Sequence, residues 1–214
     1  MFGLPDITYF GKIVPKNKFY DKLAIDKKLE RSFIDQIASI RWLHKLSADT
    51  LNVEKGGTVE EVEVFQIKLK TSELDLNVLR QMDRQLHYHL IFILEFEEQY
   101  QLWTGYKEES TNTAFKVGNY YHTGWVTEGT FSLRIDGLNM DTVYENLVRQ
   151  IAGDKLTQEN SESLKETVDR QAVREKLEKS IEKLRAKIRK EKQFNRQVEL
   201  NKQLKALIKQ LEAL

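Results

Sequence analysis

Five residues have the types and spacing that a metal-dependent nuclease would need. Gln66 and Lys68 flank one apolar residue on a predicted strand, and Asp49, Glu61 and Glu63 supply carboxylates shortly before them. In a degenerate restriction-endonuclease-like core, such carboxylates would hold Mg²⁺ and the lysine would steady the attacking water. However, glutamine is a poor ligand for a hard cation, and glutamates with lysines are common on exposed strands. The nuclease, with its Mg²⁺, is therefore the alternative hypothesis.

Other catalytic patterns are weaker. His87 and His89 fall on one face of a predicted strand, but without a clear third ligand nearby, packing is their favoured role. The Gly56-Gly57 pair lacks the following Lys and Ser or Thr of a phosphate-binding loop. The chain has no cysteine, which excludes thiolate metal sites and cysteine nucleophiles. We expect no catalytic residue, no metal and no cofactor.

A strongly basic stretch near the C-terminus has the charge to contact phosphate groups. Residues 157–214 carry 15 Lys and Arg against 10 Asp and Glu, a net charge of +5, which leaves −4 for residues 1–156. The candidate phosphate-binding residues are Lys183, Arg185, Lys187, Arg189, Lys190 and Lys192. Such contacts would weaken steeply with salt. The alternative, a merely solvated helix face, is the more common origin of such a pattern.

The element that carries these cations is predicted to be one long helix. After a polar linker at residues 154–162, Ser163 and Glu166 have capping-box spacing, and residues 163–214 contain neither Gly nor Pro. A continuous helix of this length, about 75 Å at 1.5 Å per residue, is too long for a small domain to bury. We expect a long, basic amphipathic helix that packs on something else.

Two apolar stripes on this helix have the spacing of coiled-coil seams. The expected partner-binding residues are Val173, Leu177, Ile181, Leu184 and Ile188 in the first stripe, and Leu200, Leu204, Leu207 and Leu211 in the second. Between the stripes the register breaks near Phe194 and Val198. The break permits either a stutter in one helix or the bend of a helical hairpin. The continuous helix is favoured, because Asn195 is the strongest turn former available.

Residues 1–153 are predicted to form one globular domain around a buried strand. Five consecutive large apolar residues, Leu90 to Leu94, indicate a strand that is covered on both faces. The pattern around it alternates helices and strands, with Asp26 and Asn139 as helix caps. This order favours the α+β class: a mixed central sheet with flanking helices, followed by the coiled-coil-like C-terminal helix.

The composition favours a cytoplasmic protein. No apolar run approaches the roughly 20 residues needed to cross a bilayer, and the N-terminus does not resemble a signal peptide. We therefore expect no membrane association.

Short motifs spread over nearly the whole chain resemble a bacterial family known as domain of unknown function 4391. They are Pro15-Lys16 with Phe19-Tyr20, Ile40-Arg41-Trp42, Lys45-Leu46 with Asp49-Thr50-Leu51-Asn52, Val64-Phe65, Tyr88, Tyr106-Lys107, and Glu191-Lys192-Gln193-Phe194-Asn195 with Val198-Glu199-Leu200-Asn201. Members of that family are often encoded beside helicases and DNA methyltransferases in restriction-like defence clusters. The resemblance implies an accessory subunit in phage defence and supplies no catalytic residues.

The sequence therefore predicts a non-enzymatic interaction subunit of a bacterial DNA-processing or phage-defence complex. Its C-terminal helix would dock on a protein partner, such as a helicase or a DNA methyltransferase, or would pair with a second copy of the chain. The basic stretch would add a possible DNA contact.

Overall fold

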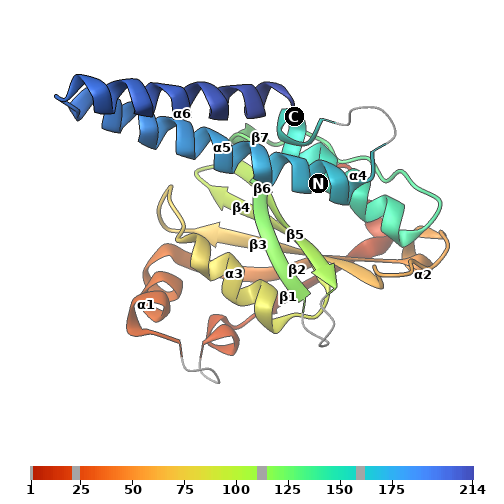
Figure 1. Cartoon of the computed structure of the whole chain (residues 1–214). Helices are drawn as coiled ribbons and strands as arrows, with labels where there is room; N and C mark the ends of the chain where they lie inside the picture. The colour runs from red at the N-terminus through yellow and green to blue at the C-terminus, as the bar shows by residue number, and fades with distance from the viewer. Residues whose placement is uncertain (1, 21–24, 110–114, 158–161) are drawn as a thin grey trace. The chain divides into compact units, whose positions relative to one another are not determined.

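The computed structural model describes residues 2–20, 25–109, 115–157 and 162–214. They form two compact units, Met1–Gly153 and Asp154–Leu214. The first unit contains the sheet, and the second contains two long helices (Figure 1). None of the helices within the described ranges combines the length and the apolar character needed to span a bilayer.

A seven-stranded sheet forms the body of the first unit, in the order β1-β2-β3-β4-β5-β6, with β7 paired to β5. The strands are β1 (Tyr9–Val14), β2 (Ile37–Ser47), β3 (Glu61–Leu69), β4 (His89–Phe96), β5 (Gln99–Glu109), β6 (Phe115–His122) and β7 (Val126–Thr127). β3 and β4 are parallel, and the other named pairs are antiparallel. A parallel pair requires a crossover, which α3 (Leu76–Gln85) provides. The predicted α+β class with a mixed sheet is confirmed.

The helices of this unit begin at side chains that accept backbone N–H groups. Besides α3 they are α1 (Lys27–Gln36), the short α2 (Ala48–Leu51) and α4 (Met140–Ala152). Asp26 caps α1 and Asn139 caps α4, as the sequence predicted. Asp75 caps α3, since its carboxylate accepts the N–H of Asn77 at 2.9 Å.

Strand β4 lies near the middle of the sheet and is covered on both faces. Leu90 and Phe92 belong to a core cluster that includes side chains of α1 and α3. His89, which points to the opposite face, packs its ring 4.3 Å from the ring of Tyr144 in α4. The helices therefore cover both faces of this strand, which explains the unbroken apolar run from Leu90 to Leu94.

Two irregularities shape the β1 side of the sheet. The register between β2 and β3 shifts between Trp42 and His44, so β2 has one extra residue, Leu43, opposite the Val64-Phe65 step of β3. Strand β1 was not predicted as a strand, because its aromatics and lysines do not alternate cleanly. Its pairing with β2 shifts at Gly11, which has a positive φ of 65°. Residues 130–135, between β7 and α4, form no strand.

The prediction of a single C-terminal helix is wrong. The second unit is a hairpin of α5 (Leu164–Lys190) and α6 (Phe194–Glu212), which run side by side after a bend at residues 191–193 (Figure 1). The capping box of Ser163 with Glu166 does start α5, as predicted.

Side-chain amides and carboxylates make the bend without Gly or Pro. The amide of Gln197 donates to the carbonyl oxygens of Ile188, at 3.4 Å, and Glu191, at 3.0 Å, at the end of α5. The carboxylate of Glu191 accepts the backbone N–H of Gln193 at 2.9 Å. These bonds replace some of the backbone hydrogen bonds that an uninterrupted helix would form at residues 191–193. Because the chain folds back there, the apolar stripes of α5 and α6 can pack against each other.

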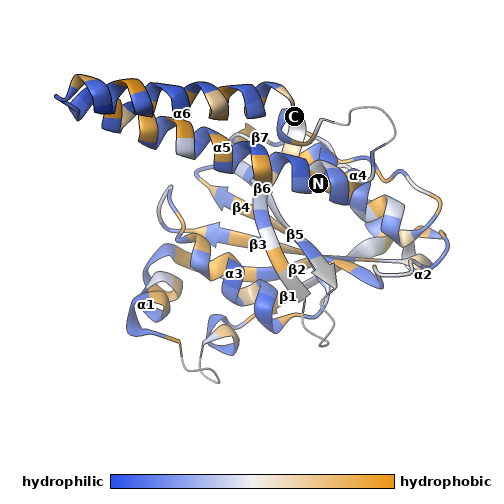
Figure 2. Ribbon diagram, in the orientation of Figure 1, coloured by the Kyte–Doolittle hydropathy of each residue, from blue (hydrophilic) through white to orange (hydrophobic). Residues whose placement is uncertain are grey.

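The mutual cover is incomplete. Ile181 and Leu200 are buried, whereas Val173 is exposed. The other expected seam residues, Leu177, Leu184, Ile188, Leu204, Leu207 and Leu211, are half-buried. Hydrophobic residues are interspersed with hydrophilic ones along both helices (Figure 2). The hairpin therefore retains apolar surface after its own packing.

We predict that Leu200→Ala destabilises the hairpin by about 2–4 kcal/mol, because it removes a buried side chain between the two helices. Hydrogen exchange should accelerate in α5 and α6 while the β4 amides remain protected. Val198→Ala, at a more exposed neighbouring position, is the matched control and should change exchange little. Unchanged exchange in Leu200→Ala would contradict the hairpin.

Candidate functional site

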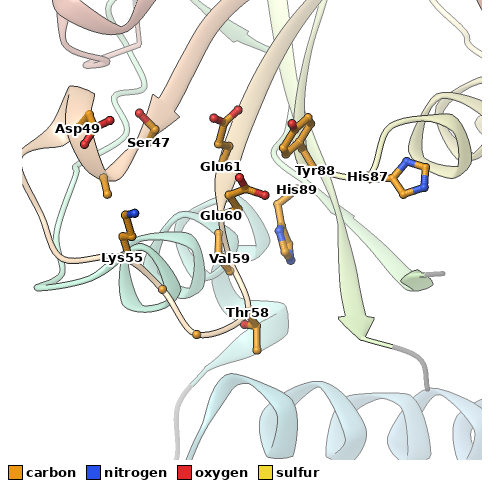
Figure 3. A pocket seen from close by; sticks show the side chains of 13 residues that line it. Ser47, Asp49, Lys55, Thr58, Val59, Glu60, Glu61, His87, Tyr88 and His89 are labelled. Atoms are coloured by element: carbon orange, nitrogen blue, oxygen red, sulfur yellow. The ribbon is translucent and has the colours of Figure 1, made fainter. Parts of the chain in front are cut away.

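The residues of the alternative nuclease site do not come together. Asp49 and Glu61 line a cavity of about 560 Å³, where β2 ends and β3 and β4 begin (Figure 3). Gln66 and Lys68 lie towards the other end of β3. At about 3.3 Å per residue, Lys68 is roughly 23 Å along the strand from Glu61. Glu63 is buried two residues beyond Glu61.

Lys68 instead pairs with one carboxylate on the neighbouring strand. Its Nζ lies 3.1 Å from Oε1 of Glu95 in β4. The amide of Gln66 donates to the other oxygen of Glu95 at 2.8 Å. Within the described ranges, no group of three or more His, Asp or Glu side chains is arranged to hold a metal ion.

The cavity at the starts of β3 and β4 is polar, and Glu61 lines it from β3. Oε1 of Glu61 pairs with Lys45 at 2.8 Å, while its buried Oε2 has no hydrogen-bond partner. Burial, together with the nearby charge of Glu61, raises the pKa of Glu63, two residues further along β3, to about 7. Glu63 is therefore partly protonated at neutral pH.

The two histidines beside this cavity have separate roles. His87 is exposed and precedes β4, whereas His89 is buried, and the two point in different directions (Figure 3). Burial, together with the nearby charge of Lys107, lowers the pKa of His89 to about 4. His89 is thus a neutral side chain packed against Tyr144, consistent with the packing role favoured from the sequence.

A loop near the cavity holds a carboxylate on consecutive backbone N–H groups. Asp141, in the first turn of α4, accepts the N–H groups of Gly57, Thr58 and Val59 at 2.6, 3.1 and 2.8 Å. The hydroxyl of Thr58 donates to the same carboxylate at 2.9 Å. A Cβ at Gly56 would lie 2.6 Å from Oδ1 of Asp141, so only glycine fits there. The anion-binding geometry of this loop is filled from within the chain.

A buried ion pair joins α3 to the sheet. Lys107 of β5 lies 3.0 Å from Asp83 of α3, and neither side chain is exposed. The Lys107 ammonium also donates to the carbonyl oxygens of Asp83, Leu86 and Tyr88, and the hydroxyl of Tyr120 donates to Asp83. Burial raises the pKa of Asp83 and lowers that of Lys107, and each charge opposes the shift of the other.

The predicted phosphate-binding residues lie at the bend end of the hairpin. Lys183, Arg185, Lys187, Arg189, Lys190 and Lys192 are all exposed. From residue 183 to 209 the hairpin carries ten Lys and Arg against two Asp and Glu, whereas residues 157–182 carry five against seven. Where the structure describes the chain, none of these six cations forms an ion pair with an acidic side chain within 4.0 Å. The positive charge of the tail is thus concentrated at one end.

The hairpin also forms a groove between its two helices. The groove has a volume of about 490 Å³ and is lined by Ser180, Lys183, Leu184, Lys187, Gln203, Ala206 and Leu207. Two of its residues, Lys183 and Lys187, belong to the basic stretch, and Leu184 and Leu207 belong to the predicted seams. Apolar contact area and positive charge therefore meet in one surface.

Sequence reasoning missed the Asp141 loop and the Asp83–Lys107 pair. The Gly56-Gly57 pair signalled an unusual loop, but nothing local points to a carboxylate 84 residues later. Tyr106-Lys107 is one of the motifs of the family resemblance, but nothing around it in the sequence indicates that the lysine is buried. The partners of both groups are set by the packing of distant elements.

We predict that Asp141→Asn lowers the free energy of unfolding by about 1–3 kcal/mol at pH 7, because an amide cannot accept all four bonds. Burial alone would raise the pKa of Asp141, but its hydrogen bonds hold it below the ordinary 3.8. The stabilisation is therefore present above that value and is lost as the pH falls through the lowered pKa. Urea titrations at several pH values measure this; Asp136→Asn, at an exposed position, is the control.

The pH dependence from Glu63 has the opposite sign. Its folded pKa, about 7, exceeds the ordinary 4.5, so its contribution to stability is complete below pH 4.5 and is lost as the pH rises through 7. Glu63→Gln should remove this slope and raise the free energy of unfolding at pH 8 by roughly 1–3 kcal/mol. Glu60→Gln, an exposed neighbour, should leave the slope intact; a slope that persists in Glu63→Gln would contradict the assignment.

Comparison with known proteins agrees with the sequence motifs. The family model described as "Domain of unknown function (DUF4391)" matches residues 2–211. No curated protein and no solved structure matches the chain. The match spans both units, from the sheet to α6, and the chain therefore belongs to the DUF4391 family.

Proposed function

We propose that this protein is a non-enzymatic accessory subunit of a bacterial DNA-processing or phage-defence complex, and that it docks through the α5–α6 hairpin. The observation that carries the proposal is the incomplete cover of the hairpin seams, at a place where exposed lysines border the groove. The restriction-like gene neighbourhoods implied by the family resemblance supply the class of partner, a helicase or a DNA methyltransferase.

The chemistry of the groove defines the surface of that partner. Leu184 and Leu207 offer apolar contact, and Lys183 and Lys187 flank it with positive charge. An amphipathic helix with a leucine ridge and acidic flanks is complementary to such a surface. Apolar burial would supply the affinity, and the charges would set orientation and the rate of encounter. Coiled-coil packing of α5 on α6, with the partner helix as a third strand, is part of this proposal.

The partner fits the surface better than a second copy of the chain does. The hairpin carries a large excess of cations from residue 183 to 209, so two copies that paired along this stretch would bring like charges together. An acidic partner removes that repulsion. Self-association therefore remains an outcome to be measured, and light scattering distinguishes it from hetero-assembly.

The metal-dependent nuclease is the weaker proposal. It would require Lys68 and two carboxylates in one cleft, but Lys68 is engaged by the single carboxylate of Glu95. The cavity that holds Asp49 and Glu61 does not include Gln66 or Lys68. A nuclease would therefore need another arrangement of these residues.

We predict that Leu184→Asp with Leu207→Asp abolishes co-purification with a helicase or methyltransferase encoded beside the protein and co-expressed with it. A second variant, Lys183→Glu with Lys187→Glu, leaves the apolar packing in place and should weaken the complex at low salt. Leu138→Asp, at an apolar position that is 85% exposed in the first unit, is the control. Circular dichroism verifies that each variant is folded.

Two results would contradict this proposal. Co-purification that is unchanged in both groove variants would exclude the hairpin as the docking element. Mg²⁺-dependent cleavage of DNA by the purified chain that is lost in Lys68→Ala would favour the nuclease.

A further inference from the structure

An exposed aromatic ring lies at the bend of the hairpin. Phe194, the first residue of α6, is 77% exposed, although phenylalanine side chains are usually buried. The hairpin does not need this ring for its own packing, since Leu200 and Ile181 occupy its interior. An exposed ring at a bend is available to a ligand.

Cations outnumber acids around this ring: Glu191 is the acid between Lys190 and Arg196, and its carboxylate accepts the backbone N–H of Gln193. Lys190 and Lys192 precede Phe194, and Arg196 follows it, all three exposed. The pairing of Arg196 with Glu199 is an exposed contact at 4.0 Å, which neutralises little of its charge. Gln193 and Asn195 add exposed amides beside the ring. We name Lys190, Lys192, Phe194 and Arg196 the bend surface.

We propose that the bend surface binds single-stranded nucleic acid, with Phe194 stacked on one base and the three cations holding the flanking phosphates. Base stacking on an aromatic ring together with phosphate contacts from Lys and Arg is the general basis of single-strand binding. Within a duplex the bases already stack on one another, so the ring would gain less there. The amides beside Phe194 have the donors and acceptors needed to contact a base edge.

A membrane surface explains the bend less well. Interfacial binding requires a broad apolar face along a helix. At the bend, Phe194 is one aromatic among amides, cations and the carboxylate of Glu191. The single ring of Phe194 can stack on one base, whereas it offers too little apolar area for a membrane.

The inference deepens the proposed function and rests on it for the biological setting, since a DNA-processing complex exposes single strands. Its residues lie outside the groove proposed to dock the protein partner. The two proposals can therefore fail separately.

The test uses the full chain alone, with fluorescence anisotropy of a labelled oligothymidine of about 15 nucleotides and of a duplex of equal length. We expect the single strand to bind more tightly. Phe194→Ala should weaken its binding about tenfold or more, and Phe194→Trp should retain it. Lys190→Ala with Lys192→Ala should reduce the slope of log affinity against log salt by about 0.7 for each lost phosphate contact.

Matched controls use residues outside the bend surface. Lys176→Ala with Lys179→Ala removes two exposed cations from the other end of α5, and should leave the salt slope nearly unchanged. Val198→Ala trims a partly exposed apolar residue of α6 and should leave the affinity unchanged. Circular dichroism checks that Phe194→Ala remains helical.

Three results would overturn the inference: equal affinity of Phe194→Ala and the parent chain for the oligothymidine, equal affinity of the parent chain for single strand and duplex, or Phe194-dependent binding to anionic phospholipid vesicles instead of the oligothymidine. If oligonucleotide binding fails while co-purification with the neighbouring protein persists, the bend inference is wrong and the proposed function stands. If single-strand binding holds but co-purification is insensitive to the groove variants, the proposed function is wrong.

Discussion

The ammonium of Lys107 is the contact on which the first unit most depends. This charged group is fully buried. It pairs with the Asp83 carboxylate and donates hydrogen bonds to three carbonyl oxygens at the end of α3 and just before β4. Desolvating such a pair is costly, so it is tolerated only where the geometry satisfies both charges. Because the hydroxyl of Tyr120 also donates to Asp83, one polar cluster joins the crossover helix to β5 and β6. The cluster thus anchors the C-terminal end of the crossover helix, which connects the parallel strands β3 and β4.

The sequence predicted those parts of the fold that depend on residues close together in the chain, such as helix caps and apolar runs. The caps at Asp26, Asn139 and Ser163 each use a side chain and a backbone N–H three residues further on, and the sequence predicted all three. The apolar run of β4 gave the covered strand. The bend at residues 191–193 was mispredicted because Gln197 and Glu191 replace the turn formers that sequence reasoning looks for. Strand β1 was missed because its irregular ladder disturbs the alternation that marks a strand.

The same distinction between local and distant interactions decides which candidate sites the sequence could predict. A run of lysines and arginines is visible in the sequence, and charged side chains are usually exposed. The basic stretch could therefore be located from the sequence alone. Whether side chains from different elements come together in one site cannot be seen from the composition. Asp49, Glu61 and Lys68 are near in sequence, yet the extended β3 separates them and the partner of Lys68 comes from β4. The partners of Gly57 and Lys107 lie on other elements, and only the packed structure brings them into contact.

The positive φ of Gly11 has a consequence for how copies of the molecule behave at high concentration. Strand β1 ends the sheet, and a regular strand in that place would offer a row of free amides and carbonyls to another molecule. The kink at Gly11 shifts the ladder between Tyr9 and Lys12, and so limits the length of strand that a neighbour could extend. This edge of the sheet is thereby made a poor template for aggregation, even though Ile13 lies exposed on it.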